Sequence, residues 1–104
     1  MADQRHQMVA RLWEAHLQAQ FPARLRGAEV VGVEMILLDA DTAGCVKSWL
    51  DNHGQLDARR QDVIASCLNE LNRVVAILTD HDEAAYYNRL RELAALICDQ
   101  PAPK

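Results

Sequence analysis

The stretch AEVVGVEMILLDADTAGCVKSWLDN, residues 28–52, decides the fold of this chain of 104 residues. Aliphatic side chains nearly fill its window 30–38, where periodicity alone does not separate a buried strand from a buried helix. No second strand candidate occurs elsewhere in the sequence, and one strand cannot pair its own backbone groups. The sequence therefore predicts a long helix that begins irregularly near Glu29 and ends at Asn52. The pattern leaves open whether Ala28–Leu38 is helical throughout.

Apolar residues recur at helical spacing in three more segments, residues 4–20, 57–78 and 81–99. Their apolar faces consist of Val9, Leu12, Trp13 and His16 in the first, of Leu56, Val63, Ile64, Cys67, Leu68, Leu71, Val74, Val75 and Leu78 in the second, and of Tyr86, Leu90, Leu93, Ala94 and Ile97 in the third. Asp57 and Asp80 stand where helix caps are expected. Short connections favour antiparallel neighbours. The sequence thus predicts an all-α, four-helix bundle-like single domain over residues 1–104, with an ordered core of about 4–99 and short flexible termini.

Composition argues against several classes of function. The formal net charge of −4 disfavours a nucleic-acid binder, which needs a basic face. No segment has the roughly 18 uninterrupted apolar residues of a membrane span, and the N-terminal residues lack an apolar signal region. The three cysteines, Cys45, Cys67 and Cys98, are far apart and odd in number, which favours buried thiols over a disulfide framework or a zinc site. We therefore expect a cytoplasmic protein.

The sequence predicts no catalytic, metal or cofactor site. His16 lies within the apolar face of its helix, where a histidine with one hydrogen-bond partner is commoner than a catalytic one. Glu34 and Asp41 are seven residues apart, hence on one helical stripe, but the chain has no Glu-x-x-His motif for a two-metal bundle site. We expect these two acids to reach solvent or to pair with Arg11 or Arg73. Asp39, on the opposite side, is expected to be solvated.

Two stretches resemble a family of proteins. Residues 37–46, LLDADTAGCV, with Trp49-Leu50, and residues 86–94, YYNRLRELA, are similar to small, all-helical bacterial proteins with no assigned activity. This resemblance implies a bacterial, cytoplasmic origin. It brings no functional residue to this chain.

The function that these patterns favour is a non-enzymatic protein–protein interaction module, with an immunity or antitoxin protein as one concrete version. Its partner is another protein or a second copy in a homodimer. The second helix is apolar on several sides, and Val31, Met35, Ile36 and Leu38 are the predicted interface. A competing arrangement has the other three helices wrapped around the second, leaving a monomer. The alternative function is a small-molecule-binding protein or enzyme with a pocket between helices. That pocket would draw on His16, Glu34, Asp41, Trp13 and Trp49.

Overall fold

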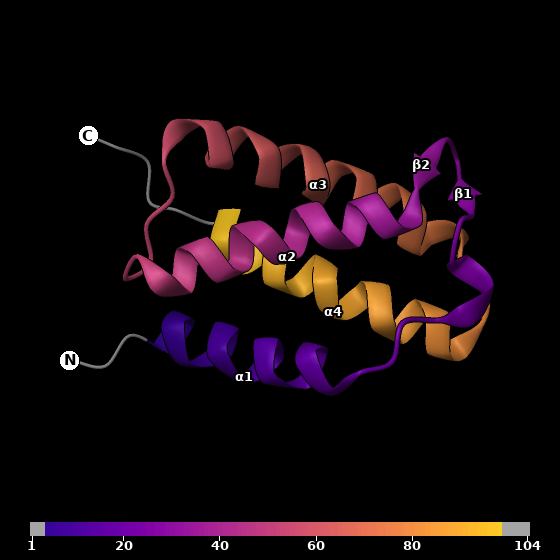
Figure 1. Cartoon of the computed structure of the whole chain (residues 1–104), viewed down its shortest axis with the longest axis horizontal. Coiled ribbons are helices and arrows are strands. Elements are labelled where there is room, and N and C mark those ends of the chain that lie inside the picture. The colour runs from indigo at the N-terminus through magenta and orange to yellow at the C-terminus, as the bar shows by residue number, and fades with distance from the viewer. Residues whose placement is uncertain (1–3, 99–104) are drawn as a thin grey trace.

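Helices make up most of the computed structural model, which describes residues 4–98 (Figure 1). The elements are α1 (Gln4–Gln18), the short 3-10 helix η1 (Ala23–Leu25), β1 (Glu29–Val30), β2 (Val33–Glu34), α2 (Met35–Asp51), α3 (Ala58–Ile77) and α4 (His81–Cys98). Four helices packed against each other confirm the predicted all-α, single-domain architecture for the described residues. The expected flexible termini, residues 1–3 and 99–104, lie outside them.

Helices α2 and α4 each pack against all three other helices of the bundle. In Figure 1, α2 runs between α1 and α3 with α4 behind. The three other helices therefore surround much of α2, as in the competing arrangement considered for the sequence, but they leave one of its faces uncovered.

None of the described helices combines the length and the apolar character that crossing a bilayer requires.

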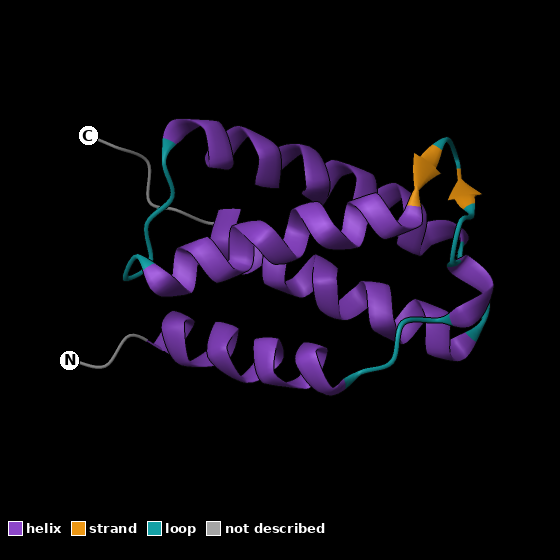
Figure 2. Cartoon of the chain, in the orientation of Figure 1, coloured by secondary structure: helices purple, strands orange, loops and turns teal. Residues whose placement is uncertain are grey.

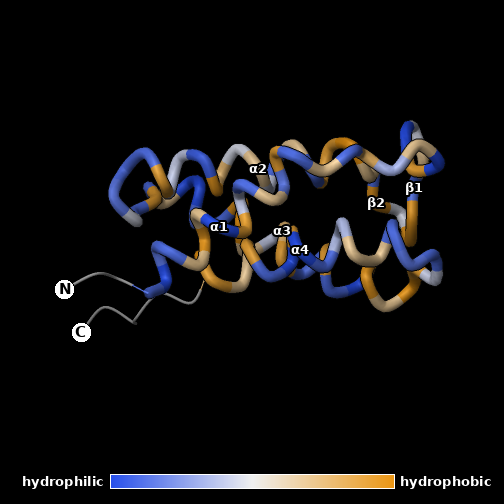
Figure 3. The backbone as a smooth tube through the Cα atoms, turned by 90° about the horizontal axis from the view of Figure 1, so that it is seen from below, coloured by the Kyte–Doolittle hydropathy of each residue, from blue (hydrophilic) through white to orange (hydrophobic). Residues whose placement is uncertain are grey.

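The core is aliphatic with a few large aromatic side chains. Its largest fully buried members include Trp49, Tyr87, Met35, Leu71 and Leu90. The predicted apolar face of α4 is buried throughout. On the predicted apolar face of α3 the central residues are buried and those at its edges are half-buried. Figure 3 shows this alternation of hydrophobic and hydrophilic residues along the helices.

The prediction of helix before Met35 is wrong. Residues 29–34 form an antiparallel hairpin in which Glu29 pairs with Glu34 and Val30 with Val33 (Figure 2). A strand needs a partner for its backbone, and here the partner comes from within the same apolar run. Val31 and Gly32, both with positive φ, reverse the chain between the two strands. From Met35 onward the predicted helix is confirmed to Asp51.

Side-chain caps fix where the helices begin. The Asp57 carboxylate accepts a 2.8 Å hydrogen bond from the Arg60 backbone N–H, and Asp80 accepts from two backbone N–H groups at the start of α4. Both caps were predicted. A third, at Glu34, accepts from the backbone N–H groups of Ile36 and Leu37 and so starts α2 directly after the hairpin. The hairpin and the first turn of α2 are thereby held as one unit.

Candidate binding groove

His16, the first residue considered for a catalytic role, forms a hydrogen bond with Asp39. Its Nε2 lies 3.0 Å from Asp39 Oδ1, and the hydroxyl of Tyr86 donates a 2.6 Å hydrogen bond to Asp39 Oδ2. The expectation that Asp39 is solvated is therefore wrong. Residue 39 faces α1 and α4 rather than water, because α2 packs on both of these helices.

This network is built to hold helices together. His16 is buried, and its ring stacks on Trp13 and contacts Tyr86. Burial and the neighbouring Asp39 carboxylate raise the pKa of Tyr86, so its hydroxyl stays a neutral donor. A buried histidine that faces a carboxylate on one side and rings on the others connects α1, α2 and α4, in line with the non-catalytic interpretation of His16.

The five residues of the alternative pocket do not come together. His16 packs between Trp13 and Tyr86. Trp49 is buried near the other end of α2, where its ring stacks on that of His6 with 5.4 Å between the ring centroids. Glu34 and Asp41 alone share a hollow, which they line from a different side of α2. Of the two outcomes expected for these acids, solvent or an arginine, Asp41 is exposed to solvent, while Glu34 caps its own helix.

A second ion pair fastens the segment between α1 and the hairpin. Arg24 of η1 donates through Nε and Nη2 to the two carboxylate oxygens of Glu83, at 2.8 and 3.1 Å. Glu83 is buried at the start of α4, whereas Arg24 is exposed, and this hydrogen bond raises the pKa of the guanidinium. The sequence suggested only a helix cap at Asp80 for this region, so the long-range pair of Glu83 was missed.

Three hollows between α2 and α3 share lining residues and form a groove along these helices, which we call the α2–α3 groove. At the hairpin end it opens into a hollow of about 400 Å³. Its apolar lining includes buried Val33, Leu38 and Cys67, half-buried Val63, and Leu37. Its polar lining consists mainly of four carboxylates, those of Glu29, Glu34, Asp41 and Glu70.

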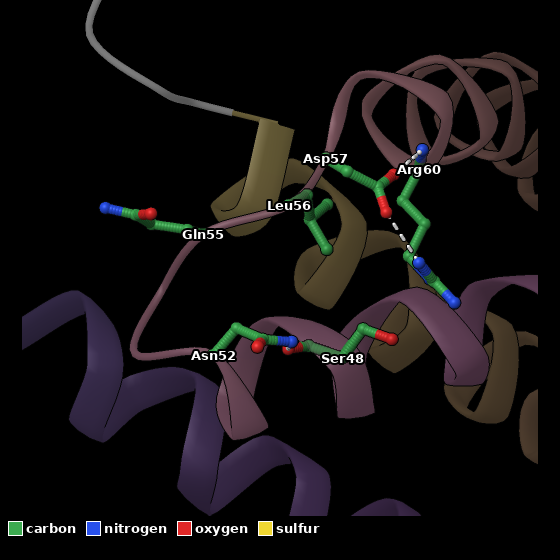
Figure 4. Close-up of a pocket in the computed structure, with 6 residues that line it drawn as sticks. All are labelled: Ser48, Asn52, Gln55, Leu56, Asp57 and Arg60. Atoms are coloured by element: carbon green, nitrogen blue, oxygen red, sulfur yellow. Dashed lines mark hydrogen bonds and ion pairs between the residues drawn. The ribbon is translucent and has the colours of Figure 1, made fainter.

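The groove continues along the helices. Asp41 and Val63 also line a second hollow, of about 380 Å³, together with Ala40, Gly44 and Arg59. Ser48 and Arg60 connect this hollow to a third, of about 320 Å³, at the α2–α3 connection. Figure 4 shows this last hollow, with Ser48 on α2 and Asn52 just after it across from Asp57 and Arg60, and with the Gln55 side chain extending away.

The two ends of the groove differ in charge. Within the described part of the chain, the hollow at the hairpin end is lined by four carboxylates and by no Lys, Arg or His. Toward the other end lie Arg59 and Arg60, and Arg60 Nη1 donates a 2.7 Å hydrogen bond to Asp57. The groove is thus strongly acidic beside the hairpin and nearly balanced beside the α2–α3 connection.

Exposed apolar side chains border the acidic end. Val31 at the hairpin tip is 50% exposed, and Ile36 and Leu37 in the first turn of α2 are 40% and 56% exposed. Met35 and Leu38, which the sequence placed at an interface, are core residues at 0% and 2% exposure. They lie on the side of α2 that packs against the other helices of the bundle.

Among residues 4–98, no three His, Cys, Asp or Glu side chains are grouped so that they could hold a metal ion. No protein-family model, curated protein or solved structure matches the chain. The resemblance to small bacterial proteins therefore identifies no family. The chain is a small, compact and mostly helical protein.

Proposed function

We propose that this chain is a protein–protein interaction module. Its binding surface comprises the hairpin tip, the exposed first turn of α2 and the adjoining α2–α3 groove. An open groove with an apolar floor and a charged border resembles the surfaces that bind protein segments more than the enclosed pockets that hold small molecules. The dispersal of the alternative pocket residues also favours this proposal over a small-molecule site.

The observation that carries the proposal is the conformation of Val31. A two-residue hairpin turn with positive φ at both positions normally takes Asn, Asp or Gly. Here the first position is a β-branched residue at φ 45°, half exposed to water. Neither the turn nor the core gains from a valine at this place, since the left-handed conformation costs it roughly 1–2 kcal/mol. Departures of this kind concentrate at functional sites, and contact with a partner would use the side chain.

The partner is either another protein or a second copy of this chain, and a small acidic partner of a basic toxin is one form of the proposal. We place the module in the cytoplasm, because all three cysteines are free thiols.

The chain offers a matched pair of positions for a test. Leu37 on α2 and Leu17 on α1 are both exposed leucines, at 56% and 59%, on different faces of the bundle.

The test is size-exclusion chromatography of cell extract that contains the chain at its natural level, with the chain detected by antibody. We expect it to elute as a species larger than the free chain. Leu37→Lys should shift it to the free-chain volume, because a charge in the contact must lose its water, while Leu17→Lys should not. The proposal is wrong if the wild type elutes as the free chain, or if the two variants behave alike.

A further inference from the structure

We propose that the α2–α3 groove binds a basic amphipathic helix of another protein, with the lysines or arginines of that helix placed against the hairpin end. This inference rests on the proposed function and specifies its partner. It follows from the shape of the groove, from the placement of its charges and from the poor match that a second copy of the chain would make.

The shape of the groove suits a helix. It follows α2, whose 17 residues span about 25 Å, a length that a docked helix of similar size would match. Its base is apolar at the hairpin end, and apolar side chains spaced i, i+3, i+4 and i+7 are how a helix fills such a groove. Farther along, Ala40 and Gly44 are exposed and present little side chain, and there is open space around Gly44. A partner helix can approach the backbone of α2 there.

The charges select a basic occupant. Glu29 and Glu34 are direct partners across the hairpin, and like charges placed opposite each other destabilise a strand pair. Both line the acidic hollow, together with Asp41 and Glu70. A lysine or arginine between these carboxylates would relieve the repulsion, so binding gains from the partner's charge as well as from its apolar side chains.

A second copy of the chain matches this groove poorly. If two grooves met with their hairpin ends together, eight carboxylates would face one another. If the copies met head to tail, the acidic end would face Arg59 and Arg60, and Arg60 is already paired with Asp57. One guanidinium would then have to balance four carboxylates. The electrostatics therefore favour another protein with a cluster of basic residues.

The probe for this proposal is a synthetic helical peptide of about 20 residues, long enough to span the groove. It carries leucines at the spacing given above and lysines elsewhere, and a control peptide has glutamates in place of the lysines. Binding is measured by isothermal titration calorimetry on the whole protein. The test variant is Asp41→Lys with Glu70→Lys, and the matched control is Glu14→Lys with Glu92→Lys, which changes the net charge equally on α1 and α4. Circular dichroism verifies that each variant folds.

We expect the lysine peptide to bind the wild type at least about tenfold more tightly than the glutamate peptide. The groove variant should lose about tenfold in affinity, while the control variant should change by less than about twofold. Equal losses in both variants would mean that the peptide responds to net charge alone, which overturns the proposal, as does an absence of binding. A wild-type dimer that the groove variant separates would also overturn it, by showing a second copy in the groove. The interaction module itself would survive each of these results, because its own test depends on the natural complex and on Leu37.

Discussion

Tyr86 of α4 donates a 2.6 Å hydrogen bond to Asp39 of α2, 47 residues away in the chain, and the same carboxylate accepts from His16 of α1. One half-buried acid thus joins three helices on the side of α2 that faces the core. The opposite side of α2 borders the groove, where Leu37 and Asp41 lie on either side of Asp39 in sequence. The helix therefore carries a structural residue on one side and residues of the proposed binding surface on the other.

We expect Asp39→Ala to lower the free energy of unfolding by roughly 2 to 4 kcal/mol, because Tyr86 and His16 both lose a charged hydrogen-bond partner inside the bundle. The measurement is urea denaturation followed by circular dichroism. Asp41→Ala is the control, since Asp41 is exposed two residues away, and it should change stability by less than about 0.5 kcal/mol. Similar losses for both variants would show that the network does not hold the helices together.

Leu71→Ala tests the core assignment of α3. Leu71 is fully buried, so its truncation should cost roughly 2 to 5 kcal/mol of stability through lost burial and a residual cavity. The exposed Leu17 provides the control, and Leu17→Ala should stay within about 0.5 kcal/mol of the wild type. A loss of less than about 1 kcal/mol for Leu71→Ala in chemical denaturation would contradict the assignment.

Stability should fall at high pH. Burial raises the pKa of the Cys67 thiol from its ordinary value of 9.0 to about 11, and burial also raises the pKa values of Tyr86 and Tyr87. Between pH 9 and 11 the unfolded chain releases the Cys67 proton while the folded chain retains it. The unfolded state then binds fewer protons, so the free energy of unfolding decreases as pH rises.

The measurement for this prediction is urea denaturation at pH 7.5, 9 and 10.5. Cys67→Ala removes one of the titrating groups, so its stability should decline less steeply over the same range, whatever the substitution does at neutral pH. A wild type whose stability is constant or increases from pH 9 to 10.5 would contradict the pKa shifts on which the prediction rests.

Sequence patterns predicted the helices well because each is specified by local features, an apolar face and a capping acid such as Asp57 or Asp80. The hairpin was missed because its strands have two residues each, too short for alternation to be detected within an apolar run. The signal available was Gly32 in the middle of that run, at a position where a two-residue turn needs positive φ.

The groove was only partly visible in the sequence. Glu34 and Asp41 were placed on one side of the second segment, and they do share a hollow. Glu70, however, comes from α3, and its approach to Asp41 depends on how two helices pack. Asp39 was misjudged for the same reason, because its partners His16 and Tyr86 lie 23 and 47 residues away. Long-range polar contacts leave no periodic trace in the sequence.

Val31→Asn should stabilise the protein by about 1 kcal/mol, because asparagine tolerates the left-handed conformation that valine resists. It should also weaken the natural complex, since the apolar side chain is lost. Val31→Thr is the matched variant. It keeps the branched shape and the strain, so it should bring no gain in stability, and its hydroxyl replaces a methyl group, so it should still weaken the complex. Thermal denaturation and size-exclusion of extract give the two readings. A stable Val31→Asn variant that binds as well as the wild type would remove the functional explanation for the strained valine.

The most direct test of the binding surface is photo-crosslinking in living cells, with benzoylphenylalanine introduced at position 37 or at position 17. Both positions are exposed to a similar extent on helices, so the reagent has the same access to passing proteins at each. If the hairpin end of the α2–α3 groove is the binding surface, position 37 gives a discrete crosslinked product that contains a protein partner, and position 17 does not. A product from position 17 alone, equal products from both, or none from position 37 would contradict the account.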